Sequence, residues 1–259
     1  MGEIKIVFFD IDGTLVNFHA HQISEKVEEA LIRLKNKGIK LVIATGRGPI
    51  QLPKFDRVEF DAFLCFNGSY VFDREGLIAS TPLAKTDIQQ ILENSHRLDR
   101  PIIMAAEDRL VCNGLDDDLE EYLSFGVIQP EHIDNIEDFS AQKDIYQMMI
   151  AGRQHEYDAI VKDVNESKIV AWWDRAMDLI PKASSKGRAV ESILKHYHIE
   201  KEEAMAFGDG NNDIPLLQAV GHGVAMENAS EELKAVAKTT CGHVKDDGVY
   251  TYLCEQGII

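Results

Sequence analysis

The stretch FFDIDGTL at residues 8–15 places two carboxylates, Asp10 and Asp12, at the end of an apolar run and then interrupts the chain with Gly13. The run begins at Ile4 and is apolar at nearly every position, which is typical of a strand covered on both faces in a parallel sheet. An isolated Asp-x-Asp-Gly is usually a turn with capping carboxylates. Its meaning therefore depends on what the rest of the chain places beside it.

The composition of the 259 residues is that of an ordinary globular protein, with 45% hydrophobic and 27% charged residues. The chain has 27 basic and 44 acidic residues, and the resulting net charge of −17 repels nucleic acids and anionic membranes. The four cysteines show no C-x-x-C spacing, and the first residues show no basic start followed by a long apolar run. We therefore expect a cytoplasmic protein with free thiols, with no nucleic-acid, membrane or obligate protein partner.

Strand and helix patterns alternate on both sides of the chain's middle. Ser24 offers an N-cap to a helix that Gly38 ends, and an apolar strand follows at residues 39–45. The remaining expected elements are a strand at 62–68, a hairpin over 70–80, a helix at about 186–196, a strand at 203–209, a helix over 214–220, a strand at 223–226 and a last helix near 230–237. This alternation predicts an α/β fold with a doubly wound, Rossmann-like parallel sheet.

The segment between Pro82 and Pro181 has a different pattern. Amphipathic helices are predicted at 87–98 and 155–166, mixed with strand-like runs at 101–106, 145–152 and 168–173. We expect residues 83–181 to form an inserted α+β cap domain that selects the substrate, while residues 1–82 and 182–259 together form the catalytic core.

Four polar clusters fall at or beside the predicted ends of core strands. They are DID at 10–12, ATGR at 44–47, SSKG at 184–187 and GDGNND at 208–213. Ligands of an open parallel sheet bind outside the carboxyl ends of its strands, so these clusters are expected to share one site.

Two other patterns in the sequence favour simpler interpretations. GDGNND departs from the dinucleotide pattern G-x-G-x-x-G because Asp213 occupies the third glycine position, where a carboxylate would oppose pyrophosphate. His19 and His21 form an H-x-H pair without a further convergent ligand, which is more typical of surface residues than of a metal site.

The segments DIDGTL, TGR and GDGNND, with Lys186 before the last, resemble in order the four motifs of the haloacid dehalogenase (HAD) superfamily of phosphatases. The large insert, FNGS at 66–69, and the tail GVAMENA followed by DDGV resemble its Cof-type, or sugar-phosphatase-like, branch. The resemblance implies a Mg²⁺-dependent phosphoric monoester hydrolase. It also implies that Mg²⁺ binds the Asp10 carboxylate, the Asp12 carbonyl and Asp209, with Asp213 either binding the ion directly or orienting a ligand.

The residues of the first motif suit the chemistry of phosphate monoesters. Asp10 can attack phosphorus and form an aspartyl phosphate, which divides one difficult displacement into two easier ones. Residues i and i+2 of a strand share a side, so Asp12 is expected beside Asp10 as the acid that protonates the leaving oxygen and then as the base that activates water. Gly13 would let the chain turn away.

The other motifs supply groups that can hold a phosphoryl group. An ammonium such as that of Lys186 attracts a phosphoryl oxygen 4 Å away by roughly 4 kcal/mol at an effective dielectric near 20, although a lone lysine in a helix is more often solvated. The Thr45 hydroxyl, the Gly46 backbone N–H and the Asn212 amide can donate hydrogen bonds to phosphoryl oxygens.

We therefore expect Mg²⁺-dependent hydrolysis of small phosphorylated metabolites, such as sugar phosphates, nucleotides or cofactor phosphates. Two alternatives remain open. A phosphomutase would use the same core and return the phosphoryl group to its substrate. A non-enzymatic receiver or binding module phosphorylated on aspartate would also use an acidic pocket with a threonine and a lysine, although Asp12 and a large lid argue against it.

Overall fold

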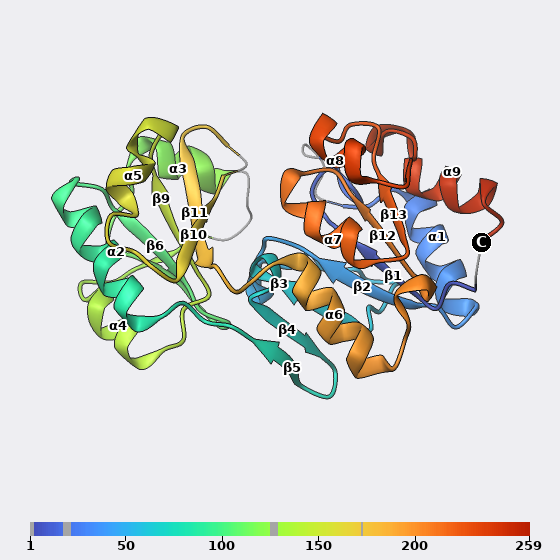
Figure 1. Cartoon of the computed structure of the whole chain (residues 1–259), viewed down its shortest axis with the longest axis horizontal. Helices are drawn as coiled ribbons and strands as arrows, with labels where there is room; N and C mark the ends of the chain where they lie inside the picture. The colour runs from blue at the N-terminus through green and yellow to red at the C-terminus, as the bar shows by residue number, and fades with distance from the viewer. Residues whose placement is uncertain (1–2, 18–21, 125–128, 172) are drawn as a thin grey trace. The chain divides into compact units, whose positions relative to one another are not determined.

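The structure is a computed structural model that describes residues 3–17, 22–124, 129–171 and 173–259 (Figure 1). The chain divides into two compact units, one formed by Met1–Gly46, Pro53–Ser80 and Ser185–Ile259 and the other by Arg47–Leu52 and Thr81–Ser184. The histidine pair at 19 and 21 and residue 172 of the strand-like run expected at 168–173 lie outside the described residues. No helix among those described is long and apolar enough to cross a membrane.

The first unit is built on an eight-stranded sheet in the order β14-β13-β12-β1-β2-β3-β4-β5. Strands from β14 to β3 run parallel, and the hairpin of β4 and β5 adds two antiparallel strands at one edge. The strands are β1 (Ile6–Phe9), β2 (Lys40–Ala44), β3 (Ala62–Cys65), β4 (Tyr70–Asp73), β5 (Leu77–Ser80), β12 (Ala204–Gly208), β13 (His222–Ala225) and β14 (Thr239–Thr240). This is the doubly wound α/β sheet that the sequence predicts.

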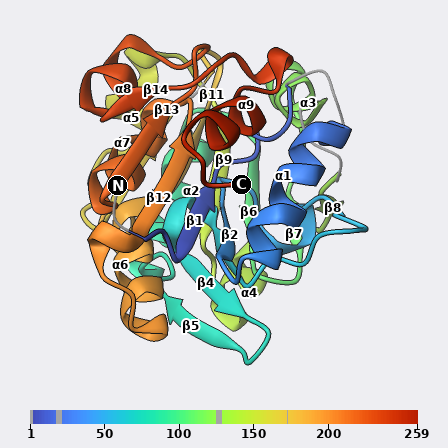
Figure 2. The same ribbon diagram turned by 90° about the vertical axis from the view of Figure 1, so that its right-hand side faces the viewer.

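Helices cover both faces of this sheet (Figure 2). On one face, α1 (Glu25–Asn36) packs against α9 (Gly248–Glu255), and on the other, α6 (Lys186–Tyr197) packs against α7 (Ile214–Ala219), which also contacts α8 (Glu231–Val236). Ser24 caps α1 as expected, because its hydroxyl oxygen accepts a hydrogen bond from the Val27 backbone N–H at 3.1 Å.

Two expectations for the first unit are wrong. The strand expected to reach residue 68 ends at Cys65, because a 3₁₀ turn follows at Phe66–Gly68. The helix near residue 230 is not the last one, since α9 follows it.

The order of the strands reverses between β1 and β12. These two strands are neighbours, with Ile6 opposite Ala204 and Phe9 opposite Phe207. From β1 the chain moves to β2 on one side, whereas from β12 it moves to β13 on the other. In doubly wound sheets such a reversal opens a crevice at the carboxyl ends of the two strands, where ligands bind.

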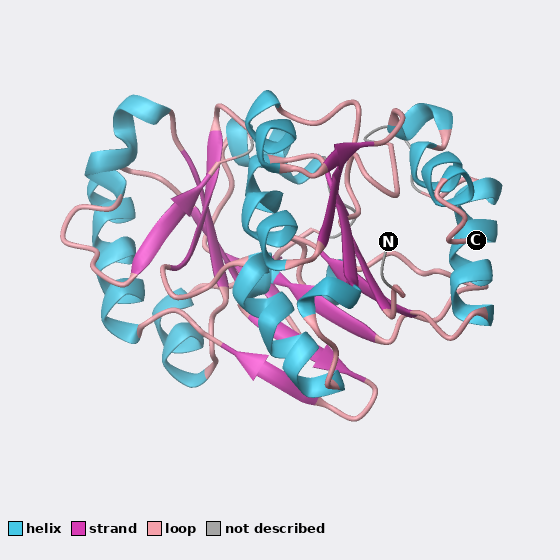
Figure 3. Cartoon of the chain, turned by 45° about the vertical axis from the view of Figure 1, so that its right-hand side comes forward, coloured by secondary structure: helices cyan, strands magenta, loops and turns pink. Residues whose placement is uncertain are grey.

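The second unit contains a six-stranded sheet in the order β10-β11-β9-β6-β7-β8, and helices flank its strands (Figure 3). All neighbouring strands are antiparallel except β7 and β8. The strands are β6 (Ile102–Ala105), β7 (Leu110–Cys112), β8 (Glu131–His132), β9 (Gln147–Ala151), β10 (Ser167–Val170) and β11 (Ala176–Pro181).

The two faces of this sheet are covered differently. An apolar core joins α2 (Lys85–Arg97), α4 (Ile136–Gln142) and α5 (Tyr157–Ile160) to one face. Residues of β11 alternate between faces, so Met177 and Leu179 enter that core whereas Asp178 meets α3 (Asp117–Ser124), whose Tyr122 hydroxyl donates a 2.7 Å hydrogen bond to it.

The helix expected over residues 155–166 is wrong in extent. A 3₁₀ turn covers Gln154–Glu156, α5 covers only Tyr157–Ile160, and Asp163 then adopts a left-handed φ of 62°, which a helix cannot accommodate. The role of this unit as a substrate-selecting cap stays a prediction.

Candidate active site

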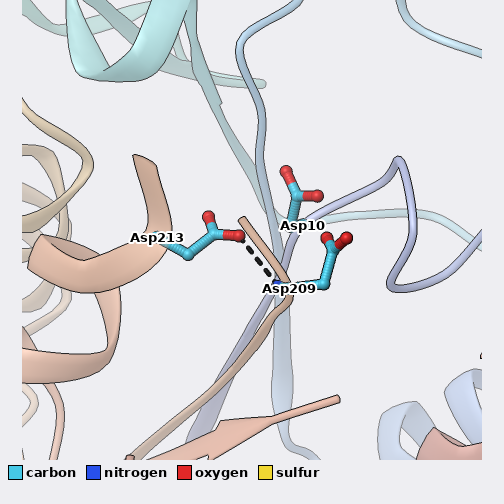
Figure 4. A group of neighbouring side chains, drawn as sticks. All are labelled: Asp10, Asp209 and Asp213. Atoms are coloured by element: carbon cyan, nitrogen blue, oxygen red, sulfur yellow. Dashed lines mark hydrogen bonds between the residues drawn. The ribbon is translucent and has the colours of Figure 1, made fainter. Parts of the chain in front are cut away.

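Three aspartates gather at the carboxyl edge of the first sheet (Figure 4). Asp10 follows β1, Asp209 follows β12, and Asp213 closes the turn before α7. The Asp10 backbone N–H donates to the Phe207 carbonyl at 3.1 Å, which continues the pairing of the two strands into the site. One carboxylate oxygen of each aspartate lies within 4.8 Å of the others. The strand reversal therefore brings together residues about 200 positions apart in the chain.

Lys186 supplies the positive charge for this cluster. It is the first residue of α6, and its Nζ donates hydrogen bonds to Asp10 Oδ1 at 2.7 Å and to Asp213 Oδ1 at 2.6 Å. Only 1% of the residue is exposed, so it is not the solvated lysine that a lone helical position would suggest. Ser185 fixes the start of the helix by accepting a hydrogen bond from the Arg188 N–H.

The surroundings shift the pKa values of Asp10, Asp209 and Lys186. Burial raises the pKa of Asp10 well above its ordinary value, and the charges of Asp213, Asp209 and Asp12 add to that rise while Lys186 opposes it. Burial and the charge of Asp213 also raise the pKa of Asp209 to about 7. Burial disfavours the charged form of Lys186, but the attraction of Asp10 and Asp213 outweighs burial and raises the pKa of the ammonium. Lys186 therefore stays charged, and its charge opposes the rise in the pKa of Asp10.

Both carboxylate oxygens of Asp213 have partners within the protein. Oδ1 accepts from Lys186, and Oδ2 accepts from the backbone N–H groups of Asp209 and Gly210 at 3.0 and 3.2 Å. Asp213 therefore fixes the loop that carries Asp209, which fits an orienting role better than direct contact with an ion.

The turn after Asp10 packs closely against Asp209. Gly13 has a φ of 83°, and a Cβ on it would lie 2.1 Å from Asp209 Oδ2, so the close approach requires glycine. The Thr14 hydroxyl donates to Asp209 Oδ1 at 3.2 Å. Asp12 is half-buried and close enough for its charge to raise the pKa of Asp10, although β1 ends at Phe9 and Asp12 lies in the turn rather than in the strand.

Three of the four residues expected to hold phosphoryl oxygens contact Asn67, which lies outside the four motifs. Thr45 follows β2 and is 1% exposed, and its carbonyl accepts from the Asn67 N–H at 3.0 Å. Asn212 donates through Nδ2 to Asn67 Oδ1 at 3.0 Å, and Gly46 lies against the same amide. An amide nitrogen carries two hydrogens, so this bond occupies one of the donors that Asn212 offers.

No role was predicted from the sequence for three residues of the site: Thr14, Asn67 and Asn228. Asn228 Nδ2 donates to the Gly13 carbonyl at 2.8 Å, and its Oδ1 accepts from the Val244 N–H at 3.0 Å. Thr14 lies inside DIDGTL, Asn67 inside FNGS and Asn228 inside GVAMENA. Their positions within these segments were therefore the only indication in the sequence that they belong to the site.

The donor set fits a hard divalent cation. It consists of carboxylate oxygens, which Mg²⁺ prefers, and the single charge of Lys186 leaves part of the negative charge of the three aspartates uncompensated. Asp10 and Asp209 each contribute one oxygen to this set, and each also accepts a hydrogen bond at Oδ1, from Lys186 and from Thr14 respectively.

Comparison with known proteins gives consistent results over nearly the whole chain. A family model described as haloacid dehalogenase-like hydrolase matches residues 7–253. The putative phosphatase YkrA of Bacillus subtilis is 28% identical over 256 residues, which cover 98% of each chain.

Solved structures agree with the sequence matches. BT1666 of Bacteroides thetaiotaomicron, a phosphatase of this superfamily, superposes with a TM-score of 0.90 at 29% identity over 99% of this chain and 96% of that one. The subclass IIB sugar phosphatase BT4131 superposes with a TM-score of 0.88 at 29% identity over 98% and 100%.

Proposed function

The chain belongs to the haloacid dehalogenase-like hydrolases, as a phosphatase of the Cof-type branch, and on that premise we propose that it hydrolyses small phosphorylated metabolites through an aspartyl phosphate on Asp10. The observation that carries this proposal is the convergence of Asp10, Asp209 and Asp213 around the buried Lys186 at the strand reversal. A nucleophilic carboxylate beside a fixed ammonium is what phosphoryl transfer needs.

Asp10 acts as the nucleophile. Its carboxylate oxygen forms a bond to phosphorus as the bond from phosphorus to the leaving alkoxide breaks, and Asp12 gives its proton to that alkoxide. Asp12 then takes a proton from a water molecule that attacks the aspartyl phosphate, which releases inorganic phosphate and restores the Asp10 carboxylate. Lys186 favours the ionised form of Asp10 and aims its Oδ1.

The remaining proposed residues bind and orient the phosphoryl group. Thr45, Gly46, Lys186 and Asn212 present a hydroxyl, a backbone N–H, an ammonium and an amide to its oxygens. Mg²⁺, held by Asp10, the Asp12 carbonyl and Asp209 and oriented through Asp213, would neutralise charge on the transferred phosphoryl oxygens. The chemistry of the donors supports this ion.

The proposed substrate is a small phosphate monoester such as a sugar phosphate, a nucleotide or a cofactor phosphate. The likeness to the sugar phosphatase BT4131 supports this class. The second unit is proposed to act as the cap that selects the leaving group and excludes water during transfer.

Phosphate release from p-nitrophenyl phosphate and from a panel of phosphorylated metabolites tests the proposal, with and without Mg²⁺, in wild type and Asp10→Asn. Metal-dependent release that disappears in the variant is expected. Release that persists in Asp10→Asn would rule out this nucleophile, and conversion of a sugar phosphate to its isomer faster than phosphate release would identify a phosphomutase.

A further inference from the structure

The turn that follows β3, at Phe66–Ser69, has an unusual backbone. Phe66 and Asn67 have φ angles of 50° and 54°, and Gly68 has a φ of 99°, so three consecutive residues adopt positive φ. Left-handed conformations are unfavourable for residues with a Cβ, and for a bulky residue such as phenylalanine they are rare. Such a conformation persists only where the surrounding contacts hold it, and it is most frequent at functional sites.

Asn67 joins two of the segments that carry phosphate-binding residues. Its backbone N–H donates to the Thr45 carbonyl at 3.0 Å, and a Cβ on Gly46 would lie 3.2 Å from its Nδ2. Its Oδ1 accepts the hydrogen bond from Asn212 Nδ2 at 3.0 Å. The side chain is 4% exposed, so these contacts are protected from water.

Gly68 brings the same turn against a third segment. A Cβ at this position would lie 2.4 Å from the Ser185 carbonyl oxygen and 3.1 Å from the Lys186 backbone nitrogen. The start of α6, from which Lys186 reaches Asp10, therefore rests directly on the backbone of the turn. A side chain here would push against backbone that cannot move aside without displacing Lys186.

We propose that the Phe66–Ser69 turn sets the geometry of the phosphate site, with Asn67 as a positioning residue that aims the Asn212 amide and seats the Thr45–Gly46 loop, and with Gly68 as the support for Lys186. Thr45, Lys186 and Asn212 lie in separate segments of the chain. The Thr45 carbonyl and the Asn212 amide are hydrogen-bonded to Asn67, and Gly68 lies against the backbone at Lys186. The inference rests on the proposed function of the site.

The test for Asn67 separates its amide from its backbone. Asn67→Gly removes the amide but tolerates positive φ, so the turn should still form and the melting temperature should fall only by the loss of the buried hydrogen bond. We expect kcat/KM for p-nitrophenyl phosphate to fall about 10- to 100-fold, and the inhibition constant for inorganic phosphate to rise by a similar factor, because misplaced binding groups lose much of their effect. Asn67→Asp should retain the bond from Asn212 but place a negative charge near the phosphate.

A double-mutant cycle with Asn212→Ala shows whether Asn67 acts through Asn212. If it does, Asn67→Gly should lower kcat/KM only a few-fold further in the Asn212→Ala background, because residues that share one interaction are non-additive. Fully additive losses, or wild-type activity in the Asn67→Gly protein, would overturn the role of Asn67.

Gly68→Ala has a matched control in Gly38→Ala. Gly38 also has a positive φ, 78°, but a Cβ there would meet no atom within 4 Å. Both variants should lose thermal stability from backbone strain, and Gly68→Ala should lose more because its Cβ also clashes with the Ser185 carbonyl, but only Gly68→Ala should lose about 10-fold or more in kcat/KM. Equal activity in the two variants would contradict the role of Gly68.

These outcomes are distinct from a failure of the proposed function. A wild-type protein without Mg²⁺-dependent phosphate release would overturn the proposed function and this inference together. An active wild type, inactivated by Asp10→Asn but unaffected by Asn67→Gly and Gly68→Ala, would overturn this inference alone.

Discussion

Two buried carboxylates, Asp209 in the first unit and Asp178 in the second, have pKa values raised to about 7 but have different surroundings. Around Asp209 stand two further aspartates and the ammonium of Lys186, all at the ends of adjoining elements. Asp178 lies in the middle of β11, where burial raises its pKa and the hydrogen bonds from Tyr122 and Gln147 oppose that rise. The pKa values of the two acids are therefore raised by a similar amount, although Asp209 is buried among other charged groups and Asp178 is buried beside neutral hydrogen-bond donors.

A raised pKa does not by itself identify an active site, although it is often used as an indicator. What distinguishes the Asp209 cluster is compensating positive charge, a position at a strand reversal, and carboxylate oxygens that can bind an ion. The difference between the two acids can be tested by experiments that act on one of them and leave the other unchanged.

The largest expected effect concerns catalysis. Asp10→Asn should lower kcat for p-nitrophenyl phosphate by more than about 1,000-fold, equivalent to more than roughly 4 kcal/mol of activation free energy, because the amide cannot attack phosphorus. Asp178→Asn should keep kcat within about threefold of wild type. A comparable loss in Asp178→Asn would show that the second acid also serves the reaction.

The next effect concerns stability at the charged cluster. Lys186→Met should lower the free energy of unfolding by about 3–5 kcal/mol at pH 7, because it leaves buried aspartates without their cation. Urea unfolding would measure the change. Lys195→Met, in an exposed position of the same helix, is the control and should change stability by no more than about 0.5 kcal/mol. Equal effects would mean that the cluster does not depend on Lys186.

Asp178 should make stability depend on pH. Its folded pKa of about 7 lies above the ordinary value of 3.8, so the folded state binds the proton more tightly than the unfolded state. The contribution of Asp178 to the free energy of unfolding is fully present below about pH 4. This contribution, up to roughly 4 kcal/mol, is lost as the pH rises through 7. The difference in unfolding free energy between wild type and Asp178→Asn, measured from pH 4 to 8, should change by this amount. A pH-independent difference would show that Asp178 stays ionised throughout.

The smallest effect concerns the divalent ion. Mg²⁺ at 100 times its dissociation constant should raise the free energy of unfolding by about 2.7 kcal/mol, because it binds the folded state alone. Asp209→Asn should abolish this gain and Asp178→Asn should retain it, as thermal melts with Mg²⁺ and with EDTA would show. A gain that persists in Asp209→Asn would place the ion elsewhere.

The parallel sheet and its main helices could be predicted because local signals agree with the fold. Continuous apolar runs marked the strands, and Ser24 and Gly38 marked the two ends of α1. Helix α9 was missed because its sequence, GVYTYLCE, begins with glycine and is rich in residues that favour strands. Its helical form depends on burial of Val249, Tyr252 and Leu253, three and four positions apart, which is a tertiary effect.

The candidate site could be predicted in part for the same reason. The aspartates and Lys186 stood in recognisable motifs, but the burial of Lys186 depends on partners that are distant in sequence. Asn67 was visible only as part of FNGS, because its contacts with Thr45 and Asn212 are long-range. No local pattern marks Asp178, since its partner Tyr122 lies 56 positions earlier.

The pairing of β1 with β12 affects when the protein can become active during its synthesis. Ile6 pairs with Ala204, so β1 leaves the ribosome long before its partner exists, and at about 5–20 residues per second the interval is roughly 10–40 s. The second unit is formed by an almost continuous stretch of chain that is synthesised before β12. It can therefore fold before β1 can pair with β12. Because Asp209 and Asp213 follow β12 in the chain, a nascent chain that stops before Asp213 cannot assemble the acidic cluster.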